Sequence, residues 1–125
     1  MLLSIVMMVK DEEKYLDKTL SALNNLRKKI NAELIILDTG STDNTVNIAK
    51  KYTDKVYFAK WNNNFAHMRN ISISYAKGDW ILVLDADEIL SNCDKLIQFF
   101  RTVLYKKYKS ATIELMNISS EDENE

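Results

Sequence analysis

Short, continuous apolar runs constrain the fold of this 125-residue chain more than any other feature. Residues 1–9 and 34–37 form such runs, and residues 55–60 and 80–84 predict two further strands. Strands that are apolar along their whole length are typical of parallel sheets covered by helices on both faces. With no proline and two glycines, the chain also lacks the turn residues of an all-β fold. We therefore predict an α/β fold with a mostly parallel sheet and helices on both faces.

Helical patterns fill the segments between the expected strands. Apolar residues recur at helical spacing over residues 11–29, and residues 43–52 and 65–76 also predict helices. A further helix is expected over residues 93–108, followed by a strand over 111–116. Helices that alternate with strands in this way predict βαβ units and hence a parallel sheet.

The composition describes a single globular domain, with 46% apolar and 28% charged residues. We assign residues 1–118 to this domain and expect a disordered acidic tail over 119–125. The net charge of −1 gives no basic surface, so neither nucleic acid nor an anionic membrane is an expected partner. The single cysteine excludes an internal disulfide, which fits a cytoplasmic protein. The apolar start is too short for a transmembrane segment.

Polar residues follow each of the first four expected strands. They occupy residues 10–12, 38–40, 61–63 and 85–87. Because the carboxyl ends of parallel strands meet at one edge of a sheet, we expect these residues to face one crevice. In open α/β sheets this crevice is where ligands bind.

Asp85 and Asp87 directly follow an apolar strand and are candidates for a metal site. Mg²⁺ and Mn²⁺ take oxygen ligands, and Mg²⁺ commonly uses one or two carboxylates plus substrate phosphates. The chain has no GxxxxGK[ST] motif and no dinucleotide fingerprint of repeated glycines. A bound phosphate would therefore depend on the metal instead of a loop of backbone amides. Taken alone, such an acid pair is also typical of solvated loop starts and helix caps.

Four motifs give the chain a resemblance to a known family. They are SIVMMVKDEE at residues 4–13, LDTGSTD at 37–43, FAHMRN at 65–70 and LDADE at 84–88. In this order and at these separations they resemble family 2 glycosyltransferases. The resemblance implies the A-type glycosyltransferase fold, in which a Rossmann-like nucleotide-sugar half is joined to an acceptor half. This chain would hold the first half, so the fold is expected to be incomplete.

The resemblance also implies roles for individual residues. Asp85 and Asp87 match the family's DXD motif, in which the first acid tends toward the ribose and the second toward the metal. Asp38 matches the acid that contacts the base, often uracil, and Arg69 matches the arginine beside the nucleotide and its diphosphate. The implied donor-binding residues are Val9, Lys10, Glu12, Asp38, Thr39, Gly40, Arg69, Asp85, Ala86 and Asp87, with Asp87 and Asp85 as metal ligands.

These residues imply metal-dependent binding of a nucleotide-diphosphate sugar, with a lean toward UDP-sugars, for inverting glycosyl transfer. The cofactor would be Mn²⁺ or Mg²⁺, and the acceptor a glycan, a lipid or a protein. In the family the general base follows the DXD motif in the acceptor half, and we identify no candidate for it in this sequence. The chain is therefore expected to bind donor but to be incomplete as an enzyme. An exposed half sheet would favour self-association.

Two other functions stay open at this point. A non-catalytic nucleotide-sugar binding module would need nothing that the sequence lacks. A haloacid-dehalogenase-type phosphatase also places an acidic pair after an apolar strand and uses the first acid as nucleophile, although its motif normally opens the chain. Trp61 is interpreted as the cap of a strand end, with contact to a ligand as the alternative, and His67 is interpreted as a surface or packing residue.

Overall fold

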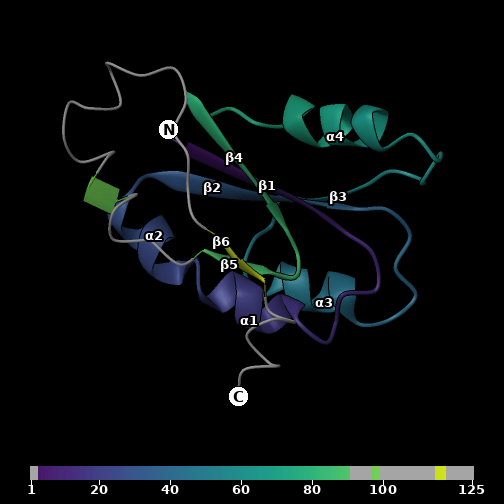
Figure 1. The fold of residues 1–125 in the computed structure, drawn as a ribbon, viewed down its shortest axis with the longest axis horizontal. Coiled ribbons are helices and arrows are strands. Elements are labelled where there is room, and N and C mark those ends of the chain that lie inside the picture. The colour runs from purple at the N-terminus through teal and green to yellow at the C-terminus, as the bar shows by residue number, and fades with distance from the viewer. Residues whose placement is uncertain (1–2, 91–96, 99–114, 118–125) are drawn as a thin grey trace.

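The computed structural model describes residues 3–90, 97–98 and 115–117. Its main sheet has four parallel strands in the order β3-β2-β1-β4, which confirms the expected parallel sheet (Figure 1). The strands are β1 (Leu3–Val9), β2 (Ala32–Asp38), β3 (Val56–Phe58) and β4 (Trp80–Asp85). A second, antiparallel pair joins β5 (Glu88–Leu90) to β6 (Leu115–Asn117).

Helices cover both faces of the main sheet, as the apolar strands predicted. Figure 1 shows α4 (Phe65–Ser74) on one face and α1 (Leu16–Ser21), α2 (Asn24–Lys29) and α3 (Thr45–Lys50) on the other. The two expected helices at 43–52 and 65–76 are present with shorter bounds. The expected helix at 93–108 lies outside the described residues except for positions 97–98, which are helical.

The prediction of one continuous helix over residues 11–29 is wrong. The chain forms two short helices instead, with a break at Ala22 and Leu23. At the break the N–H of Leu23 donates to the carbonyl of Leu20 at 3.1 Å, a three-residue spacing that tightens the turn. The break lets the buried side chains Leu20, Leu23 and Leu26 all face the sheet although the helix axis changes direction.

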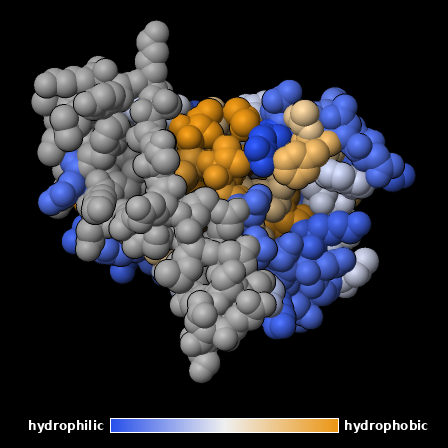
Figure 2. Space-filling view, viewed as in Figure 1, coloured by the Kyte–Doolittle hydropathy of each residue, from blue (hydrophilic) through white to orange (hydrophobic). Residues whose placement is uncertain are grey.

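The core is built around β1 and β2, the two central strands of the main sheet. All residues of β1 are buried except Met8, which is partly buried, and β2 is buried beyond its first residue. Strand β1 pairs with β2 from Leu3 opposite Ala32 onward, and with β4 from Leu3 opposite Trp80 onward. Burial on both faces explains why these strands are apolar without alternation. On β4, by contrast, Ile81 is 43% exposed, and Figure 2 shows an apolar patch over this strand.

Near the amino ends of the strands, several groups surround the buried carboxylate of Glu33. Its Oε2 accepts hydrogen bonds from the hydroxyl of Ser4 and from the backbone N–H of Lys77, the latter at 2.7 Å. Its Oε1 lies 2.5 Å from the ammonium group of Lys55. Burial opposes ionisation of this carboxyl, but the three hydrogen bonds outweigh it and lower the pKa of Glu33 from 4.5 to about 2.

Gly78, just before β4, is hydrogen-bonded to the same Ser4 hydroxyl. Its N–H donates to the Ser4 hydroxyl at 2.8 Å. A Cβ at this position would lie 2.7 Å from the carbonyl carbon of Leu3 and from the nitrogen of Ser4. A glycine is therefore required for the chain to approach β1 this closely.

We expect Glu33→Gln to lower the free energy of unfolding at neutral pH by about 1.5–3 kcal/mol, the usual contribution of hydrogen bonds to a charged group. Because the pKa of Glu33 is lower in the folded state than in the unfolded state, the folded state binds fewer protons. The stabilisation is therefore complete above about pH 5 and is lost as the pH falls toward 2. Urea denaturation at several pH values measures it.

The control for this measurement is Asp79→Asn, which neutralises an exposed carboxylate directly before β4. We expect the control to match the parent chain within about 0.5 kcal/mol. A Glu33→Gln difference that stays the same size in acid would contradict the assigned role of the charge.

Candidate functional site

The strand order reverses at β1, which places a crevice at the carboxyl end of this strand. Strands β2 and β3 follow on one side of β1, and β4 lies on the other side. Figure 1 shows the matching change of face, because α4, which leads into β4, lies opposite the helices α1, α2 and α3. In open α/β sheets, ligands bind outside the strand ends at such a reversal.

A cleft of about 340 Å³ opens at this position. It is lined by Met8, Val9, Lys10, Glu12, Thr39, Trp61, Phe65, Asp85, Ala86 and Asp87. The structure thus brings together most of the residues that the resemblance implied. Asp38, Gly40 and Arg69 are absent from this lining, and Met8, Trp61 and Phe65 are additions to the implied set. Phe65 stood within a quoted motif, but nothing in the sequence marked its ring as exposed.

The loops after β1 and β2 hold each other in place at the edge of the cleft. Asp11 has a positive φ of 52°, and its Oδ1 accepts from the N–H of Thr42 at 2.7 Å. In return, the N–H of Asp11 donates to the hydroxyl of Ser41 at 2.9 Å. The N–H of Glu12 donates to the buried hydroxyl of Thr45 at 2.8 Å. These reciprocal bonds between segments about thirty residues apart fix the backbone from which Glu12 projects.

Glu12 lies among other acids at the cleft. Burial raises the pKa of its carboxyl, and the negative charge of Asp87 raises it further, followed by smaller contributions from Asp43, Asp11 and Asp85. The carboxylates that raise this pKa lie close together, so negative charge is concentrated at the carboxyl end of β4. A cation bound there would be favoured by the same charges.

Asp38 ends β2 and organises the turn that follows it. Its Oδ2 accepts from the backbone N–H groups of Gly40 and Ser41 at 3.2 and 3.1 Å, and its Oδ1 accepts from the Ser41 hydroxyl at 2.5 Å. Gly40 has a φ of 123°, which favours glycine. Thr39 is tied to β1, because its N–H donates to the carbonyl of Val9 at 3.0 Å. The turn therefore holds Thr39 in the cleft wall while the Asp38 carboxylate caps the turn.

Arg69 projects from α4 onto a residue that lines the cleft. Its guanidinium carbon lies 4.7 Å from the centre of the Phe65 ring, which is a cation–π contact. Its Nε is buried and has no hydrogen-bond partner. Arg69 itself is not part of the cleft lining, and its contact with a diphosphate stays a prediction.

The acids of the cleft fit a hard cation that also takes ligands from its substrate. Within the described residues, no group of three or more His, Cys, Asp or Glu side chains is arranged to hold a metal by itself. Asp85 is exposed and Asp87 partly buried, and both line the cleft. Mg²⁺ typically binds through one or two carboxylates and completes its shell with phosphate oxygens and water.

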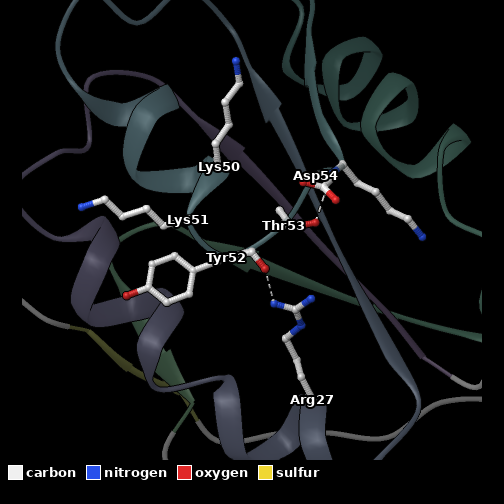
Figure 3. A pocket seen from close by; sticks show the side chains of 7 residues that line it. Arg27, Lys50, Lys51, Tyr52, Thr53 and Asp54 are labelled. Carbon is white, nitrogen blue, oxygen red and sulfur yellow. Dashed lines mark hydrogen bonds between the residues drawn. The ribbon is translucent and has the colours of Figure 1, made fainter.

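A second cavity, of about 370 Å³, lies between α2 and the turn after α3 and does not resemble a ligand site. Arg27 donates there to the carbonyl of Tyr52 at 2.7 Å, and Figure 3 shows Lys50 and Lys51 pointing away from one another and from Arg27. Lys55 is engaged by Glu33. Because these cations do not converge on one point, the cleft at β1 and β4 is the better candidate.

The fold and the cleft define the class of protein: a parallel α/β domain with a ligand crevice at a strand-order reversal, lined by carboxylates. Residues 4–104 match the family model of glycosyl transferase family 2. The chain therefore belongs to glycosyltransferase family 2.

Relatives in other organisms support this membership. A TPR repeat-containing protein of Synechococcus elongatus is 44% identical over 87 residues, which cover 70% of this chain and 21% of that protein. An uncharacterized glycosyltransferase of Haemophilus influenzae is 41% identical over 101 residues, which cover 76% of this chain and 39% of that protein. This chain thus spans between about a fifth and two fifths of the length of these relatives.

Solved structures share the fold. S. aureus TarS 1–349 in complex with UDP-GlcNAc has a TM-score of 0.65 and 25% identity, and the match covers 82% of this chain and 31% of the TarS 1–349 chain. Glucosyl-3-phosphoglycerate synthase from Mycobacterium tuberculosis, solved with Mn²⁺ and UDP-glucose, has a TM-score of 0.60 and 23% identity. The match covers 70% of our chain and 34% of the synthase chain. In the described part of our chain, no helix is long and apolar enough to cross a membrane.

We expect Thr45→Val to lower the free energy of unfolding by about 1–3 kcal/mol, because it leaves the N–H of Glu12 without its acceptor. The hydroxyl of Thr45 also donates to Asp43, so the start of α3 loses a contact as well. Thr42→Val is the matched control, since Thr42 is exposed and its hydroxyl makes one weak contact of 3.4 Å with Asp11. Urea denaturation compares the two variants, and equal losses would show that the Thr45 hydroxyl does not secure the loop.

Proposed function

We propose that this domain binds a nucleoside-diphosphate sugar, most specifically a UDP-sugar, together with a divalent cation, for inverting glycosyl transfer. The observation that carries the proposal is the acid-lined cleft at the reversal of strand order, in a chain of glycosyltransferase family 2. The fold shared with TarS, which was solved with UDP-GlcNAc, supports a uridine nucleotide as the donor.

The acids at the end of β4 would hold the cation. Asp87 and Asp85 are the proposed ligands, and Mn²⁺ or Mg²⁺ are the proposed ions, because both prefer oxygen ligands. When bound, such an ion stabilises negative charge on a departing diphosphate as a Lewis acid. Glu12 contributes negative charge beside the two ligands, and the paired loops after β1 and β2 keep it there.

The nucleoside would lie over the ends of β1 and β2. Val9, Lys10 and Thr39 line this part of the cleft, and Asp38 and Gly40 form the turn behind Thr39. A carboxylate has about four acceptor sites, of which Asp38 uses three within its turn. We propose that the remaining site accepts a hydrogen bond from a base N–H of uracil.

Two alternative functions would differ from glycosyl transfer in what happens to the bound donor. A non-catalytic binding module would bind donor without consuming it, and a haloacid-dehalogenase-type phosphatase would release inorganic phosphate. Membership of a glycosyltransferase family favours glycosyl transfer over the phosphatase. The acceptor, whether glycan, lipid or protein, and the general base are assigned to none of the described residues. A cytoplasmic location and self-association through the apolar face of β4 also stay predictions.

We expect UDP to bind only weakly without a divalent cation and more tightly with Mn²⁺. Asp87→Ala should remove most of this increase in affinity. Loss of a ligand should weaken binding of UDP with Mn²⁺ by about tenfold or more, the scale on which metal sites respond to mutation. Calorimetric titration with UDP, with and without Mn²⁺, measures both effects. Asp54→Asn is the control, since Asp54 is exposed and lines the other cavity. Parent-like binding by Asp87→Ala would remove the metal assignment.

Asp38→Ala tests the proposed contact with the base. We expect it to weaken binding of uridine as well as UDP, by the roughly 1.5–3 kcal/mol of a hydrogen bond to a charged group. Ser41→Ala is the matched variant, because it removes the hydroxyl that donates to Asp38 and accepts from the N–H of Asp11 but leaves the Asp38 carboxylate in place. If both variants are equally stable and bind uridine as the parent does, Asp38 serves the turn alone.

A further inference from the structure

Two aromatic rings are exposed in the wall of the cleft. Trp61 is 37% exposed and Phe65 52% exposed, and both line the cleft with the ends of β1 and β4. Large aromatic side chains bury much apolar area when they are covered, so their exposure in a concave site favours an apolar or planar ligand. The glycosyltransferase motifs assign no role to either ring.

The rings are held in fixed positions before any ligand binds. The indole Nε1–H of Trp61 donates to Oδ1 of Asn63 at 3.0 Å, and Asn63 adopts the left-handed conformation with a φ of 63°. Oδ1 of Asn64 caps α4 by accepting from the N–H of His67 at 3.1 Å. The segment between β3 and α4 is therefore ordered by its own asparagines, and Trp61 is part of that order instead of a cap on β3, which ends at Phe58.

Phe65 is held from two directions. Its ring centre lies 6.4 Å from that of Trp61 with an angle of 67° between the planes, an edge-to-face arrangement. The guanidinium of Arg69 lies 4.7 Å from the ring centre. Arg69 is thus a positioning residue for Phe65 in this structure. The two rings form a preformed surface, which saves the entropy of ordering them on binding.

The aromatic rings and the acids come from opposite sides of the strand-order reversal. Trp61 and Phe65 come from the connection that leaves β3 and from the start of α4, whereas Asp85 and Asp87 follow β4. The ends of β2 and β1 lie between β3 and β4 in the sheet. The cleft therefore combines an aromatic region with an anionic region that suits a cation. A nucleoside diphosphate with a metal ion has the matching polarity, with a flat ring at one end and charge at the other.

We propose that Trp61 and Phe65 form a stacking surface for the base of the bound nucleotide. The inference rests on the proposed function and adds to it which residues hold the base ring. Stacking of a base on an aromatic side chain changes affinity by about five- to a hundredfold when the ring is removed. Because the contact is with the base, the change is the same for a nucleoside as for its diphosphate and does not depend on the metal.

Tryptophan fluorescence reports the contact directly, because the chain has two tryptophans, Trp61 and Trp80. Trp80 begins β4 at the far end of the strand from Asp85 and is not part of the cleft lining. In Trp80→Phe, the emission of Trp61 alone should be quenched by uridine in the absence of Mn²⁺. Pyrophosphate with Mn²⁺ should leave it nearly unchanged.

Calorimetry then separates this inference from the proposed function. We expect Trp61→Leu and Phe65→Leu each to weaken uridine and UDP–Mn²⁺ by the same factor of about five or more. Phe58→Leu is the control, since Phe58 is 66% exposed and lies outside the cleft lining. Circular dichroism and thermal unfolding confirm that the variants are folded.

The outcomes are distinct. If the parent binds UDP–Mn²⁺ and both folded leucine variants bind it equally well, the stacking surface is wrong and the proposed function stands. Quenching of Trp61 by N-acetylglucosamine but not by uridine would place a sugar ring on the surface and overturn the inference. If the parent binds neither uridine nor UDP–Mn²⁺, the proposed function and the inference both fail.

Discussion

The position of β1 between β2 and β4 is the constraint on which the rest of the structure depends. A strand with parallel neighbours on both sides and helices over both faces is buried, and the seven residues of β1 are buried or partly buried and apolar except for Ser4. Because its two neighbours are reached through helices on opposite faces, the loops diverge at its carboxyl end. The cleft is therefore a consequence of strand order, and the polar residues at the strand ends decide what it can bind.

Beyond the carboxyl ends of the strands, hydrogen bonds between loops hold the structure, whereas apolar packing holds the sheet itself. The residues after β1 and β2 are held by reciprocal hydrogen bonds, among them those of Asp11 with Thr42 and of Glu12 with Thr45. Fixed backbone geometry lets acids accumulate that would otherwise move apart. Burial and then the negative charge of Asp87 raise the pKa of Glu12, so its ionised form is disfavoured at this position. A positive charge at the cleft would oppose this effect.

The sequence was sufficient for the four strands of the main sheet and for the common position of their carboxyl ends, because apolar runs and polar strand ends are local patterns; it did not predict β5. It was not sufficient for features that depend on three-dimensional neighbours. The break at Ala22 and Leu23 falls within an unbroken helical pattern, and only packing against the sheet decides it. Likewise, the exposure of Trp61 and Phe65 in the cleft wall depends on how the segment before α4 is placed, which no local pattern in the sequence indicated. The engagement of Asp38 within its own turn depends on the same kind of nonlocal placement.

The pKa values of two glutamates shift in opposite directions at the amino and carboxyl ends of the parallel strands. At the amino edge, three donors surround Glu33 and lower its pKa to about 2, so its charge is satisfied within the protein and fastens β1, β2 and the start of β4 together. At the carboxyl edge, burial and neighbouring acids raise the pKa of Glu12. Glutamate thus has a structural role where the protein supplies hydrogen-bond donors and a positive partner, and a proposed binding role where acids gather at the cleft.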